Sequence, residues 1–122
     1  YNDTAVARLY GFDYKYIETS SELSGELVNI MKQHQKVVFY GKTWTTDAGY
    51  HETVGQVLSY RNKAALCVEM EGVGLFTIAK YRECAASAIY IISDVFGDEE
   101  WLLGCSGEAI PNAVRAVLGV IA

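Results

Sequence analysis

The residues from Ala64 to Tyr81 read AALCVEMEGVGLFTIAKY, and this stretch decides the fold. Its first five residues form a short apolar run that is typical of a buried strand, and apolar residues at helical spacing follow Gly72. Between the two patterns stand Glu69 and Glu71, separated by one methionine. A strand that runs directly into a helix places this junction at the carboxyl edge of an open α/β sheet, where ligands bind.

Two acids in so apolar a stretch need partners, because an unpaired charge is costly to bury. In one interpretation Glu71 interacts with the positive end of the helix dipole and Glu69 faces solvent. In the other, one carboxylate accepts hydrogen bonds from two adjacent hydroxyl groups of a ligand, and Met70 packs on the ligand's apolar face. The sequence pattern alone leaves both interpretations open.

The rest of the chain alternates between strand and helix patterns. A strand or extended arm fits residues 1–16, and strands are expected over 37–40, continued by 43–46, and over 85–92. Helices are expected from residue 20 to about 35, over 53–61 and over 106–122. This order predicts an α/β fold with a mainly parallel sheet, in which the very apolar 85–92 segment is a central strand. Residues 1–122 are expected to form a single domain.

Composition excludes several classes of function. The net charge is −5, which argues against nucleic acid and anionic membrane surfaces as partners. The apolar runs are shorter than the roughly 20 residues of a membrane span. The three cysteines lack metal-like spacing, and both histidines are isolated, so no metal site and no cofactor are expected. Reduced cysteines indicate a cytoplasmic protein.

Three motifs together point to a family. The first is VEMEG at residues 68–72, the second IISD at 91–94, and the third GKTWTTDAGY at 41–50. Along the chain they stand in the order third, first, second, which is the order found in nucleoside phosphorylases and nucleosidases. The chain resembles this family, which includes purine nucleoside phosphorylases, uridine phosphorylases and methylthioadenosine nucleosidases. The resemblance implies a three-layer αβα fold with a mostly parallel, mixed central sheet, of which this chain is the C-terminal half.

The resemblance assigns roles to the residues of the first motif. Glu71 corresponds to the family's ribose-binding glutamate, and Met70 to its ribose-packing methionine. Val68 and Glu69 are expected to flank the base and sugar.

The base pocket is expected to include two neighbouring residues of the third motif. Gly49 stands where many purine-specific members carry an aromatic residue. Tyr50 is expected either to compensate for that missing ring or to be a core tyrosine.

The second motif supplies the expected catalytic residue. Asp94 follows an apolar run and a serine, so its carboxyl group is expected at the carboxyl end of a strand. Desolvation there would favour the neutral, proton-donating form, which glycosidic cleavage of a purine nucleoside needs. Ser93 is expected to orient Asp94 or to touch the base. The alternative is that Asp94 only anchors a loop.

The motifs favour a purine-type nucleoside phosphorylase that uses phosphate as co-substrate. Uridine-specific members carry a Gln-x-Arg pair that recognises the polar edge of uracil. The nearest residues in this chain are Thr53 and Gly55, which cannot make those contacts. The alternatives are a nucleosidase that hydrolyses purine nucleosides or methylthioadenosine, and a non-catalytic nucleoside-binding or assembly module. The family's phosphate-binding motif is not found in this sequence. A homo-oligomer, or pairing with a missing N-terminal half, is therefore expected.

Overall fold

Strand β2 (Lys42–Thr46) lies at the centre of a three-stranded parallel sheet, between β1 (Asn2–Asp3) and β3 (Ala65–Glu69). The computed structural model describes residues 1–34, 37–96 and 101–103. The β2 sequence, KTWTT, is rich in the β-branched and aromatic residues that favour strands. Because the strands are parallel, the carboxyl ends of β2 and β3 lie at one edge, with Thr45 opposite Glu69.

The chain forms two compact units. The first comprises Tyr1–Ser24 and Phe39–Ala88 and contains the parallel sheet. The second comprises Gly25–Val38 and Ile89–Ala122, of which the structure describes 25–34, 37–38, 89–96 and 101–103. Helix α2 (Ser21–Gln33) begins in the first unit and continues in the second. Strands β4 (Asp94–Phe96) and β5 (Trp101–Leu103) pair as an antiparallel hairpin in the second unit.

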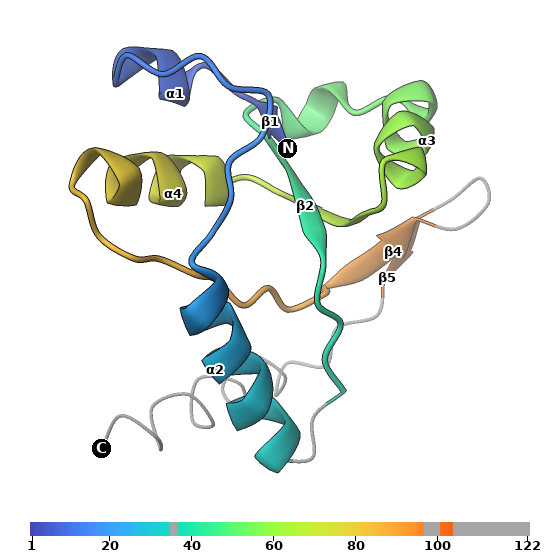
Figure 1. Cartoon of the computed structure of the whole chain (residues 1–122). Helices are drawn as coiled ribbons and strands as arrows, with labels where there is room; N and C mark the ends of the chain where they lie inside the picture. The colour runs from blue at the N-terminus through green and yellow to red at the C-terminus, as the bar shows by residue number, and fades with distance from the viewer. Residues whose placement is uncertain (35–36, 97–100, 104–122) are drawn as a thin grey trace. The chain divides into compact units, whose positions relative to one another are not determined.

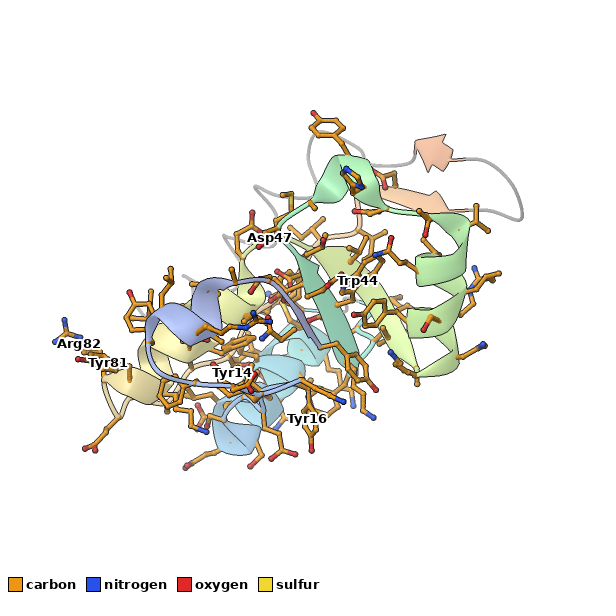
Figure 2. All side chains as sticks on the ribbon, turned by 90° about the horizontal axis from the view of Figure 1, so that it is seen from above. Tyr14, Tyr16, Trp44, Asp47, Tyr81 and Arg82 are labelled. Atoms are coloured by element: carbon orange, nitrogen blue, oxygen red, sulfur yellow. The ribbon has the colours of Figure 1, made fainter. Side chains whose placement is uncertain are left out.

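Helices cover both faces of the parallel sheet. Helix α3 (Val54–Asn62) lies on one side of β2, whereas α1 (Val6–Leu9) and α4 (Gly72–Tyr81) lie on the other (Figure 1). Alternate residues of β2 serve the two sides, as the period of a strand requires. Trp44, which is 3% exposed, stacks on Tyr60 of α3 with ring centroids 4.3 Å apart, and Figure 2 shows it on that side of β2. The next residue, Thr45, instead accepts a hydrogen bond from Val73 N of α4.

The core of the first unit lies between β2, α1 and α4. Helix α4 buries Val73, Phe76 and Thr77, which the spacing of three and four residues places on one face. Ala7 of α1 is fully buried, and α1 contacts α4. The Thr77 hydroxyl forms a short hydrogen bond with the Tyr14 hydroxyl. These contacts fix α4, and therefore its N-terminus, against the sheet.

The sequence predictions for β3, α2, α3 and α4 are confirmed within a few residues. The expected strand or extended arm over residues 1–16 is only partly right. Residues 2–3 form β1, but residues 6–9 form α1 because Asp47 Oδ2 accepts a hydrogen bond from Ala5 N and the turn buries Ala7. Asp47 directly follows β2 (Figure 2).

One expected strand is half right and another is wrong. The expected continuation over 43–46 is confirmed as β2, but residues 37–40 before it have no regular structure, and Val37, Phe39 and Tyr40 are exposed. Residues 85–92 also form no strand, although they are the most apolar run of the described chain. The 85–92 backbone is bonded to the start of α2 instead of to a strand, since Ser20 N donates to Ala86 O at 2.9 Å. The Ser24 and Ser87 hydroxyls are 2.8 Å apart and make a second link there.

The fold is α/β, with a small parallel three-stranded sheet and flanking helices. The helix expected over 106–122 lies outside the described residues. In the described part of the chain, no helix is long and apolar enough to cross a membrane.

Candidate functional site

The candidate site is the junction between β3 and α4, made of Glu69, Met70 and Glu71, which we call the Glu-Met-Glu corner. Glu69 ends β3, and α4 begins at Gly72, so only two residues separate the strand from the helix. The corner lies at the carboxyl edge of the sheet, beside the end of β2. That is the edge at which open α/β sheets bind ligands.

The Glu69 carboxylate is bonded on both oxygens to groups of the protein. Oε1 accepts a short hydrogen bond from the Thr45 hydroxyl and a longer one, 3.5 Å, from the Thr43 hydroxyl. Oε2 accepts from the backbone N–H groups of Glu71, at 2.8 Å, and Gly72, at 2.6 Å. The carboxylate therefore satisfies N–H groups at the start of α4 that no residue within the helix can satisfy.

This arrangement corrects one interpretation of the sequence. Glu69 does not face solvent: it is half-buried and caps the start of α4 with its side chain. Glu71 occupies the N-cap position, but its side chain makes no capping hydrogen bond. Among the described residues its Oε2 accepts only a 3.3 Å bond from Met70 N, and the residue is exposed. Of the two acids, Glu71 is thus the one with acceptor capacity left for a ligand.

Met70 and Gly49 are brought together at this edge. Gly49 begins the short 3₁₀ helix η1 (Gly49–His51) that follows β2, and a Cβ at position 49 would lie 3.5 Å from Met70 Sδ. The Met70 side chain is 55% exposed. The glycine therefore adds no side chain against the thioether, and Glu52 Oε1 is the other polar atom close to that position, 3.8 Å from where a Cβ would stand.

Tyr50 and Val68 are two further expected base-binding residues of the first unit. Tyr50 is fully exposed, so the expectation that it is a core tyrosine is wrong. Val68 is half-buried on β3, where it pairs with Trp44 of β2.

Asp94 and Ser93 belong to the second unit. The expectation that Asp94 ends a strand is wrong: it is the first residue of β4, because the apolar run before it forms no strand. The Ser93 hydroxyl donates a 2.9 Å hydrogen bond to Asp94 Oδ2, and the Asp94 side chain is partly buried. The serine therefore fixes the orientation of the carboxyl group.

Sequence reasoning missed the two threonines. Thr45 is 2% exposed, and its hydroxyl both donates to Glu69 and accepts from Val73 N at 3.1 Å. The signal was present, because Thr43 and Thr45 are two residues apart on a strand and so point to the same face. That face adjoins Glu69, the partner of Thr45 in the sheet register.

The charge of Glu69 acts on the thiol of Cys67, two residues before it. Burial raises the pKa of the Cys67 thiol above its ordinary value of 9.0, and the charge of Glu69 raises it further. Across residues 1–34, 37–96 and 101–103, no cluster of His, Cys, Asp or Glu could hold a metal ion. The groups that the corner exposes for recognition are the Glu71 carboxylate and the Met70 thioether.

Comparison with known proteins gives the family. No solved structure matches the chain at a significant level. The family model described as the phosphorylase superfamily matches residues 1–122, and the chain therefore belongs to that superfamily.

Proposed function

We propose that this chain supplies the ribose- and base-binding part of a purine-type nucleoside phosphorylase. The observation that carries the proposal is that Met70 and Glu71 are both exposed at the carboxyl edge of β2 and β3, with Met70 beside Gly49. Membership of the phosphorylase superfamily supports it. In this proposal the corner is the sugar subsite, and the chain is the C-terminal half of the family domain.

The chemistry of the corner suits a ribose. An ionised carboxylate only accepts hydrogen bonds, and the 2′- and 3′-hydroxyls of a ribose are two adjacent donors. The thioether of Met70 is soft and apolar, and it packs well against the carbon face of a sugar. Gly49 adds no side chain against that thioether, and Met70 itself is 55% exposed, so its surface is accessible to a ligand.

The proposed reaction exchanges the base for phosphate at the anomeric carbon. The N-glycosidic bond breaks as a phosphate oxygen bonds to C1′, and the purine leaves with a proton from Asp94. Glu71 and Met70 hold the sugar while positive charge develops on it. Ser93 orients the Asp94 carboxyl group through its 2.9 Å hydrogen bond.

The test is phosphorolysis by the chain in its native assembly. Inosine and adenosine are incubated with and without phosphate, and free base, ribose 1-phosphate and ribose are quantified. We expect base and ribose 1-phosphate only when phosphate is present. Free ribose without phosphate would instead identify a nucleosidase, and saturable binding without turnover would identify a non-catalytic module.

The proposed role of Asp94 is tested in the same assay. Asp94→Asn keeps the shape and removes the transferable proton, so purine turnover should fall by roughly 10²–10⁴, the usual contribution of general acid catalysis. Nucleoside binding should change much less, because the proton is needed in the transition state. Ser93→Ala is the matched control, since it frees the carboxyl group without removing it, and its loss should be smaller. Purine turnover within about twofold of wild type for Asp94→Asn would make Asp94 a loop anchor.

A further inference from the structure

The carboxylate of Glu69 accepts hydrogen bonds from the protein on both of its oxygens, whereas that of Glu71 accepts one weak bond. We propose that Glu69 is a positioning residue, which together with Thr45 holds the corner so that Glu71 and Met70 face the ribose. The statement that the corner receives a ribose rests on the proposed function. The statement that Glu69 and Thr45 hold the corner in place rests only on their hydrogen bonds. It replaces the expectation that Glu69 contacts the base.

The bonds of Glu69 join three elements. Oε1 is bonded to Thr45 and Thr43 of β2, and Oε2 to backbone N–H groups at the start of α4, while Glu69 itself ends β3. Thr45 adds a further link, because its hydroxyl accepts from Val73 N at 3.1 Å. Three successive amides, those of residues 71, 72 and 73, are therefore held by one carboxylate–hydroxyl pair.

This bonding leaves Glu69 with less capacity for a ligand than Glu71 has. A carboxylate has about four lone-pair sites; the Thr45 hydroxyl and the N–H groups of residues 71 and 72 occupy three of them, and the Thr43 hydroxyl, 3.5 Å away, makes a weaker contact with Oε1. A nucleoside would have to displace the backbone of residues 71 and 72 to reach it. Glu71, by contrast, has one weak backbone contact and is exposed.

The donors to Glu69 are of two kinds, so the substitution Glu69→Gln tests whether all of its hydrogen bonds are needed to hold the corner. The N–H groups of residues 71 and 72 are fixed, whereas the hydroxyls of Thr43 and Thr45 rotate. In Glu69→Gln the amide oxygen can accept from only one of these pairs. If it keeps the two N–H groups, its NH₂ group faces the hydroxyls, which must reverse to accept from it; if it keeps the hydroxyls, its NH₂ group faces the fixed N–H donors. The corner loses hydrogen bonds to a charged acceptor without losing side-chain volume, which weakens its hold on Glu71.

The experiment measures backbone protection and sugar recognition on the same variant. Amide exchange in Glu69→Gln is followed by NMR on the full chain, and the dissociation constants of inosine and 2′,3′-dideoxyinosine are determined. We expect faster exchange at residues 71–73 and roughly tenfold weaker inosine binding. Binding of 2′,3′-dideoxyinosine should stay within about twofold, since it lacks the hydroxyls that Glu71 would accept. Glu26→Gln makes the same change at an exposed position on α2 and should alter neither.

The outcomes separate the two claims. Unchanged exchange at residues 71–73 overturns the positioning role, and so does an equal loss of affinity for both nucleosides, which would mean that Glu69 contacts the base. If wild type binds neither nucleoside, the proposed function fails and the ribose part of this inference falls with it.

If Glu69→Gln does not fold, Thr45→Val carries the test. It removes one hydroxyl from the same carboxylate and leaves Glu69 in place. Thr45→Val also removes the acceptor of Val73 N, so the informative result is faster exchange at residues 71 and 72, whose N–H groups are bonded to Glu69. Thr45→Ser, which keeps the hydroxyl, should restore protection there. Protection that is equal in Thr45→Val and Thr45→Ser would contradict the inference.

Discussion

Single residues of the same type have different roles at the β3–α4 corner. Glu69 and Glu71 are two positions apart, yet one is bonded on both oxygens to the protein and the other is exposed. The sequence places both acids at a ligand-binding edge but cannot rank them. Their difference depends on Thr43 and Thr45, which come from another strand 26 and 24 residues away.

The protonation of Cys67 gives a prediction at this scale. Its pKa is raised first by burial and then by the Glu69 charge, so the folded chain holds the thiol proton more tightly than the unfolded chain does. This difference in proton affinity contributes to the free energy of unfolding. The contribution is fully present below pH 9.0, the ordinary pKa of a cysteine thiol, and is lost as the pH rises through the folded-state pKa. We therefore expect iodoacetamide to alkylate exposed Cys84 faster than half-buried Cys67 at pH 8, as measured by peptide mass spectrometry. Equal rates in the folded chain would contradict the burial of Cys67.

Local patterns predicted elements well where the elements need few partners. Helices α3 and α4 carry their own signals, namely a threonine cap and an apolar face, and strand β3 is a short apolar run. The segments 37–40 and 85–92 are just as apolar but form no strand, because a strand requires a neighbour and no local signal specifies one. The short helix α1 could not be predicted either, since it depends on Asp47, which is 42 residues from Ala5.

The capping box of α3 gives a prediction at the level of the element. Thr53 Oγ1 accepts from Gln56 N at 3.2 Å, and Gln56 Oε1 accepts from Thr53 N at 3.0 Å. Thr53→Ala removes the first bond and should lower the free energy of unfolding by about 1 kcal/mol. Urea denaturation measures this loss. Ser59→Ala, at an exposed interior position of the same helix, is the control and should cost nothing. Equal stability of the two variants would show that α3 does not depend on its cap.

The family of the whole chain was predictable from three short motifs in order, and the α/β class from the alternation of patterns. The arrangement within the site was not, because it depends on contacts between segments distant in sequence. Gly49 is the clearest case: its lack of a side chain becomes informative only when Met70 is seen beside it. Association into an oligomer, or with a missing half, stays a prediction.

The central claim is that the Glu-Met-Glu corner receives the sugar of a nucleoside, and the two methionines of the chain provide a direct test. Met70 is 55% exposed at the corner, whereas Met31 of α2 is 7% exposed. In a chain labelled with ¹³C at the methionine methyl groups, the account predicts that inosine shifts the Met70 signal in a saturable way and leaves Met31 unchanged. A titration to millimolar inosine in which the Met70 signal does not move would contradict the account.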